Sequence, residues 1–280
     1  MENTYIKKHW TNIVSQWFGH FADHEFPSPI QSFINHAYVN LLGLDMSEFA
    51  PPSTYPSLNK LFTRELKKRR PVDMRSGALI SPVDAYVTEC GPLHKDIAMQ
   101  IKGMEYSIDD LLTLQYAKEA KSIYDGSYIN FYLSPKDYHR YHMPYKLRIA
   151  SALHQPGKLY PVNFASLKRQ KELFVENERI VLECFTEHEK RVFIVLVGAL
   201  NVGRMTIAFD PRIKTNADRR MPTYYRYDKK PIWIHKGDLL GMFMMGSTVL
   251  ILAEPELLEV VTNDRTHVRF GERVGIMHEA

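Results

Sequence analysis

The hydrophobic periodicity of this chain changes near residue 77, and this change limits the folds that the chain can adopt. Before it, apolar residues recur at spacings of three and four, which is the period of an amphipathic helix. After it, short apolar runs alternate with turn-forming residues, which is typical of β-strands. We therefore expect an α+β protein in which a helical N-terminal appendage precedes a β-rich, barrel-like body.

Two helices are expected before residue 50. The stripe of the first is rich in aromatic side chains and consists of Ile6, Trp10, Ile13, Val14, Trp17, Phe18 and Phe21. The second follows Pro29 and ends at Gly43, and its stripe begins at Ile30. Two interpretations stay open, because these stripes suit either packing on the body or a membrane-facing helix that lies in the bilayer interface.

A basic segment, Leu58–Arg75, follows the helices. It contains Lys60, Arg64, Lys67, Lys68, Arg69, Arg70 and Arg75 against Glu65 and Asp73, so its balance is 7 − 2 = +5. Such a run beside an aromatic helix favours an anionic membrane surface as partner. Nucleic acid is not expected, because no recognisable binding motif accompanies the charge. No apolar run reaches the 18 residues that a spanning helix needs.

The rest of the chain is expected to be mostly strands. The predicted strands are Ala78–Cys90, Ser127–Leu133, Arg179–Phe185, Val192–Val197 and Thr248–Leu252. One helix is expected to start at Ser107, where Ser-Ile-Asp-Asp resembles a capping box. The range Arg204–Lys230 has no clear period, so we expect a long loop there.

Two histidines lie in the densest polar segment, Ser134–Pro144. His139 and His142 are three residues apart, which places both rings on one face of a helix or at one edge of a cleft. A metal site is not expected, because further ligands such as HExxH or paired CxxC motifs are missing. The histidines either bond to loop backbone or perform general acid–base chemistry, which we favour because imidazole exchanges protons near neutral pH.

A second polar motif is Gly246-Ser247-Thr248 at the start of a predicted strand. Such a sequence is often only a turn, but it also allows the serine hydroxyl to attack the preceding carbonyl when a base takes its proton. A hydrolase elbow is disfavoured, because Val249 stands where Gly-x-Ser-x-Gly needs glycine. Asp84, in the turn Ser81-Pro-Val-Asp, gains interest only as the acid that orients one histidine.

Together these motifs resemble the phosphatidylserine decarboxylase family, which consists of pyruvoyl-dependent membrane enzymes. The resemblance covers roughly residues 57–252. The matching stretches are Leu58–Arg64 with Arg70-Pro71, Ser81–Asp84, Ile101–Gly103 with Tyr106-Ser107, Leu133–Pro144, Pro161–Asn163, Asn177–Arg179, Val197–Ala199, Lys236-Gly237 and Gly246–Thr248. Two positions depart from the family pattern: Met245 replaces a frequent leucine and Ala85 a frequent glycine.

The resemblance implies a chain that cuts itself between Gly246 and Ser247. His142, oriented by Asp84, is then the base that activates Ser247. The products are a large chain, 1–246, and a small chain of 280 − 246 = 34 residues, 247–280, whose first residue becomes a covalent pyruvoyl cofactor. The mature enzyme is expected to form a Schiff base with phosphatidylserine and to release CO2 and phosphatidylethanolamine, with His139 as the proton donor.

The resemblance also implies an organisation. Residues 1–56 are expected to form a helical, membrane-associating segment and residues 57–280 the catalytic domain. The expected location is peripheral, at the cytoplasmic face of a bacterial cell membrane, and the family allows for a homodimer. Two alternatives stay open: a Ser-His-Asp hydrolase that acts on lipid or peptide without self-cleavage, and a non-enzymatic membrane-binding module with a barrel like those of lipoyl carriers.

Overall fold

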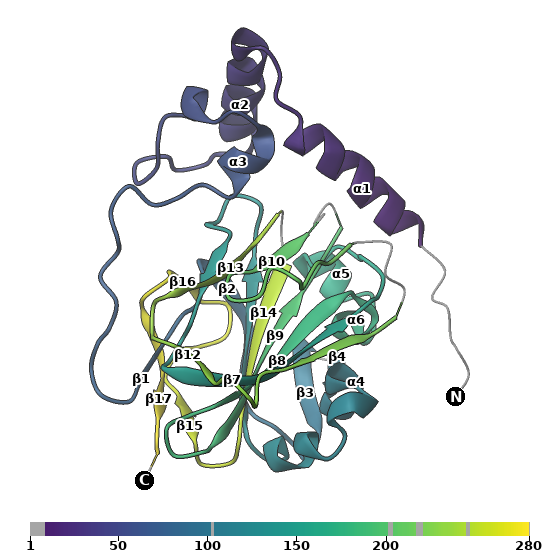
Figure 1. Ribbon diagram of the computed structural model, residues 1–280, viewed down its shortest axis with the longest axis vertical. Helices are drawn as coiled ribbons and strands as arrows, with labels where there is room; N and C mark the ends of the chain where they lie inside the picture. The colour runs from purple at the N-terminus through teal and green to yellow at the C-terminus, as the bar shows by residue number, and fades with distance from the viewer. Residues whose placement is uncertain (1–8, 102–103, 201–203, 217–220, 245–246, 280) are drawn as a thin grey trace.

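A helical layer stands on one end of a β-rich body (Figure 1). The computed structural model describes residues 9–101, 104–200, 204–216, 221–244 and 247–279. The layer contains α1 (Trp10–Asp23), α2 (Ser28–Leu42) and α3 (Leu58–Phe62). The two predicted N-terminal helices are thus confirmed, and α2 ends as expected at Gly43, whose φ of 62° closes the helix in the left-handed region. Leu58 and Leu61 of α3 pack with Ala22 of α1, so the layer extends past residue 56.

The apolar stripe of α1 faces away from the body. Trp10 and Trp17 are 61% and 77% exposed, whereas the buried residues of the helix are Thr11, Ser15 and Ala22. The polar side of α1 bonds to the body instead, because its side chains reach three loop positions. Thr11 Oγ1 accepts from the Leu159 amide (3.3 Å), Asn12 donates to the Gly157 carbonyl (3.2 Å) and Gln16 to the Asn216 carbonyl (3.2 Å). The helix is therefore amphipathic with its apolar face outward.

The body is built on one large antiparallel sheet. In the described residues its strands are ordered β11 (Thr223–Arg226), β7 (Leu147–Gln155), β8 (Arg179–Phe185), β9 (Arg191–Val197), β14 (Ser247–Ala253), β5 (Ser127–Leu133), β2 (Ala85–Pro92) and β16 (His267–Val268), and β12 (Ile232–Ile234) also pairs with β7. β11 and β16 end the order without pairing with each other, so the expectation of a barrel-like body was wrong.

The sheet stays open because each of its faces has its own core. Side chains alternate along β14, so that Val249 and Ile251 enter one core while Leu250 and Leu252 enter the other. Burial on both faces explains the nearly continuous apolar run of β9. With both faces covered, the edges need not meet to exclude water.

Smaller elements cover the two faces. The sheets β1 (Ala78–Ile80), β17 (Arg273–Met277), β15 (Leu258–Val260) and β10 (Met205–Ile207), β13 (Leu239–Phe243), β6 (Arg140–His142) contribute to the first core. The second core takes side chains from β3 (Ile97–Ile101), β4 (Met104–Ser107), α4 (Ile108–Leu112), α5 (Phe164–Leu167) and α6 (Leu173–Glu176). Short 3-10 turns lie at Pro52–Thr54, Leu114–Tyr116 and Glu119–Ile123.

The strand predictions are confirmed in part. Those for β5, β8, β9 and β14 are confirmed to within a residue, and the predicted strand Ala78–Cys90 is split by the turn at 81–84 into β1 and β2. Ser107 caps α4 as expected, since its hydroxyl accepts from the Asp110 amide (3.4 Å). The long loop expected at Arg204–Lys230 was wrong in part, because β10 and β11 lie within it; strands of three and four residues are too short to show a period.

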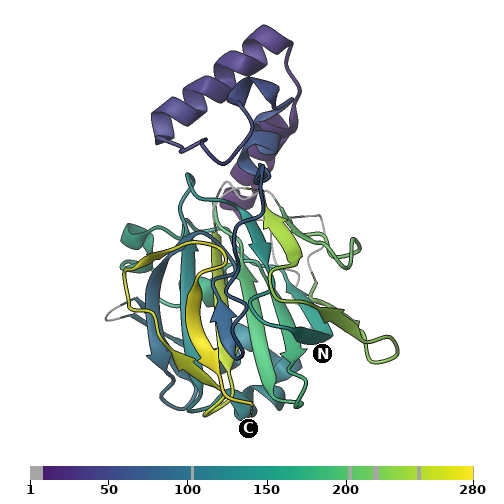
Figure 2. The ribbon, with the colours of Figure 1, turned by 90° about the vertical axis from the view of Figure 1, so that its left-hand side faces the viewer.

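The basic segment does not form one surface patch. After α3 the chain leaves the helical layer and runs along the body to β1 (Figures 1 and 2). Arg64 and Arg70 turn inward, while the exposed Arg75 pairs with Asp73. Lys60, Lys67, Lys68 and Arg69 are exposed. Among the described helices, none has the length and apolarity to cross a bilayer.

Candidate active site

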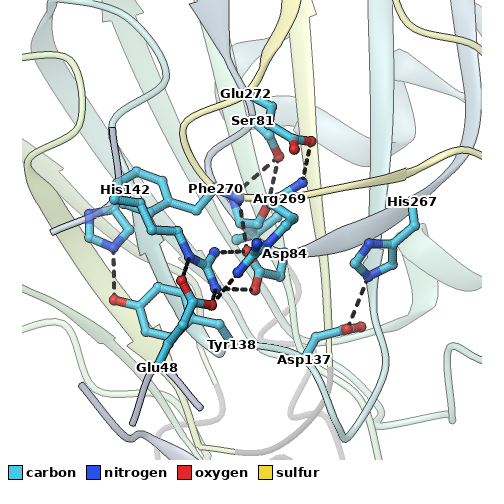
Figure 3. A network of polar contacts seen from close by, with 12 residues as sticks. Glu48, Ser81, Asp84, Asp137, Tyr138, His142, His267, Arg269, Phe270 and Glu272 are labelled. Atoms are coloured by element: carbon cyan, nitrogen blue, oxygen red, sulfur yellow. Dashed lines mark hydrogen bonds and ion pairs between the residues drawn. The ribbon is translucent and has the colours of Figure 1, made fainter. Parts of the chain in front are cut away.

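The two histidines follow a turn between β5 and β6 that is held by hydrogen bonds to the Asp137 side chain. The Asp137 carboxylate accepts hydrogen bonds from the Ser134 amide (2.7 Å) and the Ser134 hydroxyl (2.8 Å). Its other oxygen lies 3.2 Å from Nε2 of His267 (Figure 3). The chain then enters β6, which follows directly after His139 and ends at His142.

His139 is completely buried and has one unbonded ring nitrogen. Its Nδ1 donates to the Asp137 carbonyl (2.8 Å), its ring packs on Phe62 with centroids 3.9 Å apart, and Nε2 has no hydrogen-bond partner. Burial, and secondly the nearby Arg64 cation, lower the pKa of His139 to about 3. The imidazole is therefore neutral near pH 7, with a free lone pair on Nε2.

The backbone places His139 beside the segment that leads to Gly246. The Phe243 amide, at the end of β13, donates to the His139 carbonyl (2.9 Å). Gly246 itself lies outside the described residues, together with Met245. His139 is thus next to the chain three residues before the expected cleavage point.

His142 lies at the other end of β6, opposite Leu239 of β13. Its Nδ1 donates to the Gly237 carbonyl (2.9 Å), and its Nε2 accepts from the Tyr138 hydroxyl (3.1 Å), as Figure 3 shows for the second contact. The ring stacks on Phe270, with centroids 3.8 Å apart and an interplanar angle of 15°. Burial lowers the pKa of His142 to about 4, so this ring is also neutral near pH 7.

Asp84 is bound to an arginine rather than to a histidine. Its carboxylate forms a two-pronged ion pair with Arg70 (2.5 and 3.0 Å) and accepts the Phe270 amide (2.8 Å). The direct contact expected between Asp84 and His142 is absent, because both nitrogens of His142 have other partners. A buried guanidinium needs a counter-charge more than a neutral imidazole does, which explains the pairing. One link from Asp84 to His142 is Phe270, whose amide donates to the Asp84 carboxylate and whose ring stacks on the imidazole.

Ser247 begins β14, where its backbone is paired with Leu133 of β5. β5 in turn pairs with β2, in which Tyr86 lies opposite Tyr132, so Ala85 continues the same line across the sheet. Adjacent strands are about 4.8 Å apart, so the backbones of Ser247 and Ala85 are separated by roughly 10 Å, and Asp84 is the residue before Ala85. Ser247, which begins β14, and Asp84, which directly precedes β2, therefore lie at the same end of the sheet, on two strands that are separated by β5.

A cavity of about 610 Å³ opens beside this cluster. Its walls include Arg64, Arg70, Asp84, Lys136, Tyr138 and His267. Glu48 also lines it and bonds to both Arg70 (2.8 Å) and Arg269. In the described part of the chain no group of three or more His, Cys, Asp or Glu side chains is arranged to hold a metal ion.

Several residues of this site were missed by sequence reasoning. Arg64 and Arg70 were counted as part of a basic surface, although both occur in stretches that match the family. Tyr138 belongs to the histidine motif, yet nothing in the sequence indicates that its hydroxyl binds His142. Phe270 lies beyond the matched stretches and carries no sequence signal, because its role comes from where the fold places its ring and its amide.

Comparisons with known proteins show the family to which the chain belongs. The family model described as phosphatidylserine decarboxylase matches residues 58–276. A relative from Helicobacter pylori (strain Shi470), named phosphatidylserine decarboxylase proenzyme, is 46% identical over 268 residues, which is 96% of this chain and 98% of that protein. Proteins of the same name from Campylobacter jejuni and Myxococcus xanthus are 41% and 36% identical, over 93% and 90% of this chain and 97% and 89% of their own lengths.

Proposed function

Since this chain belongs to the phosphatidylserine decarboxylase family, and is thus a lyase made as a proenzyme, we propose the steps by which it matures and acts. The substrate is phosphatidylserine and the products are phosphatidylethanolamine and CO2. The observation that carries the proposal is the unbonded Nε2 of His139, a buried nitrogen beside the chain that leads to Gly246. A buried polar atom without a partner is costly, and it is typical of a position that a reaction uses.

Maturation begins at the Gly246–Ser247 peptide bond. His142 takes the hydroxyl proton of Ser247 as the oxygen attacks the Gly246 carbonyl carbon; the C–N bond breaks, an ester forms and the freed amine receives a proton. Removal of the Ser247 α-proton then expels the Gly246 carboxylate and leaves a dehydroalanine. Water hydrolyses its imine form and ammonia departs, so that a pyruvoyl group blocks the small chain.

The neutral state of His142 suits it to act as the base. Gly237 fixes the Nδ1 proton, so Nε2 carries the lone pair that must accept the proton of Ser247. In the structure Tyr138 donates to that nitrogen, and burial raises the pKa of Tyr138 to about 12, which keeps the phenol protonated. The Tyr138 hydroxyl must therefore move aside when Nε2 takes up the proton of Ser247.

A pyruvoyl group formed from Ser247 would stand at the first residue of β14. When present, this group supplies an electron sink for the electrons left behind by CO2. His139 Nε2 is free to hold a proton and pass it to the substrate carbon. Its low pKa in the structure means that a proton placed there is readily given up, and an anionic substrate nearby raises that pKa toward neutrality.

We also propose peripheral binding to anionic membranes through the helical layer. Besides the exposed stripe of α1, the helix α2 also exposes three large apolar side chains, Ile30, Phe33 and Leu41. A surface with so many large apolar side chains is typical of an interaction site. Lys60, Lys67 and Lys68 lie on or just after α3 and add attraction to anionic lipid.

Intact-mass measurement tests the proposal. The wild-type chain should yield fragments 1–246 and 247–280, the smaller one without a free amine and with a carbonyl that borohydride reduces. Ser247→Ala should stay whole. A wild-type protein that is active while uncut contradicts the proposal, and reaction of that uncut chain with a serine-directed inhibitor supports the hydrolase alternative.

A further inference from the structure

Arg64 is a buried cation whose guanidinium lies over the Phe49 ring, 4.4 Å from its centroid, rather than against a carboxylate of the described residues. The residue is only 2% exposed, and its guanidinium forms no ion pair with a carboxylate in the described part of the chain. Nη2 donates to the carbonyls of Lys136 (2.8 Å) and Asp137 (3.2 Å), whereas Nε and Nη1 have no partner. Burying an uncompensated charge costs several kcal/mol, so a fold that keeps one reserves it for an anion.

The surroundings of Arg64 form a second cavity, of about 550 Å³, on the side of the helical layer. Three of its lining residues have buried polar atoms without partners: the Tyr55 hydroxyl, Oδ1 of Asn59, and Nε and Nη1 of Arg64. Two of these groups are donors and one is an acceptor. A ligand that satisfies all three must therefore carry both an anion and a donor such as an ammonium group.

The same cavity touches the reacting part of the chain. Met244, two residues before Gly246, lines it, and the Asn59 amide group lies 3.4 Å from the Met244 sulfur. On the other side, Arg64 shares the Asp137 carbonyl with Nδ1 of His139. The cavity thus lies between the helical layer and the position where the new carbonyl group is expected.

We propose that this cavity binds the phosphodiester of the phospholipid headgroup through Arg64 and Tyr55, with Asn59 accepting from the amino group. This inference rests on the proposed function and adds the subsite that recognises the substrate. The phosphodiester is the better partner for Arg64 than the carboxylate. A guanidinium that held the carboxylate would stabilise the charge that decarboxylation must remove, and so would raise the barrier.

Binding to uncut protein tests the inference without any pyruvoyl group. Titration calorimetry on Ser247→Ala uses glycerophosphoserine, glycerophosphoethanolamine, serine and inorganic phosphate. We expect both glycerophospho compounds to bind, and serine to bind at least about tenfold more weakly. Adding Arg64→Gln should weaken the binding of both glycerophospho compounds about ten- to hundredfold, which is the effect of losing a charge-assisted hydrogen bond. Adding Tyr55→Phe should weaken their binding severalfold. The control Arg69→Gln, an exposed neighbour, should change neither.

Each contrary result is distinct. If both Arg64→Gln and Tyr55→Phe bind the glycerophospho compounds as tightly as the parent does, the proposed subsite is wrong. If Arg64→Gln does not fold, the Tyr55→Phe variant alone decides the question. Arg64-dependent binding of glycerophosphoserine but not of glycerophosphoethanolamine assigns Arg64 to the carboxylate instead. Arg64-dependent binding of inorganic phosphate that glycerophosphoserine does not displace makes it a site for free phosphate. A failure of the proposed function is seen in a different measurement, because the wild-type chain would then stay uncut.

Discussion

Asp84 and His142 are linked through Phe270 rather than by a hydrogen bond of their own. The carboxylate accepts the Phe270 amide at 2.8 Å, and the Phe270 ring stacks on the His142 imidazole with centroids 3.8 Å apart (Figure 3). Arg70 fixes the carboxylate from the other side. The link between Asp84 and His142 that these contacts form therefore runs through the amide and the ring of Phe270 and not through a hydrogen bond between the two residues.

The two histidines should separate maturation from decarboxylation. We expect His142→Ala and Asp84→Asn to slow self-cleavage by about a hundredfold or more, because each disturbs His142, the base that we propose for Ser247. His139→Ala should still be cut but should release CO2 poorly. Gel analysis of cleavage and a CO2 assay on the matured fraction measure the two steps. If His139→Ala stays whole while His142→Ala cuts normally, the roles are reversed.

Phe270 should matter for maturation through its ring alone. Phe270→Ala removes the stack on His142 and should slow cleavage about tenfold or more, whereas Phe270→Tyr keeps the ring and should cut at nearly the normal rate. Cleavage time courses after refolding or cell-free synthesis give the rates. Equal rates for Phe270→Ala and the parent would show that Asp84 acts by some other route.

The buried Arg70–Asp84 pair should be costly to break. Both side chains are about one-tenth exposed, so Arg70→Gln leaves a buried carboxylate unpaired and should lower the free energy of unfolding by about 3 kcal/mol. The matched control is Arg75→Gln, whose arginine pairs with Asp73 at the surface and whose loss should have no measurable effect. Urea unfolding of both variants in the Ser247→Ala background makes the comparison. Equal stability of the two variants would contradict a structural role for the Arg70 pair.

Stability should fall as the pH is lowered from about 6.5 toward 4. The pKa values of His139 and His142 are lowered by burial to about 3 and about 4, so below pH 6.5 the unfolded chain takes up protons that the folded chain does not. In that window, protonation of each histidine in the unfolded chain should lower the free energy of unfolding by up to about 1.4 kcal/mol for each pH unit of acidification. Urea midpoints of the uncut protein should show a shallower pH slope for His139→Gln, but not for the exposed control His36→Gln. An unchanged slope in His139→Gln would mean that this ring is protonated in the fold.

Membrane binding should depend on the outward face of α1. Trp10→Ala with Trp17→Ala should reduce co-sedimentation with vesicles of phosphatidylcholine and phosphatidylglycerol about tenfold at high salt, because apolar area is lost. The control Trp233→Ala removes a partly exposed tryptophan of β12 in the body and should have little effect. Salt should weaken binding through Lys60, Lys67 and Lys68. Binding that ignores salt, anionic lipid and both tryptophans would place the membrane face elsewhere.

Local sequence was sufficient for elements whose residues specify their own conformation. The stripe of α2 with Pro29 near its start and Gly43 at its end defines a helix, and the apolar runs of β5 and β8 define strands, because period and end signals act over a few residues. The candidate site residues were likewise chosen from their motifs, and their roles stay predictions. Asp84, His139, His142 and Ser247 lie in short stretches whose residue types suit proton transfer and nucleophilic attack.

Tertiary structure alone decided what those elements and residues contact. Periodicity shows that Trp10 and Trp17 share one face of α1, but the outward direction of that face follows from bonds between its polar side and loops 145 to 200 residues away. The sequence suggests that Arg64 and Arg70 are surface charges, whereas the fold turns both of them inward. Phe270 comes to Asp84 from 186 residues along the chain. Such contacts depend on how distant segments meet, and a local pattern carries no information about its distant partner.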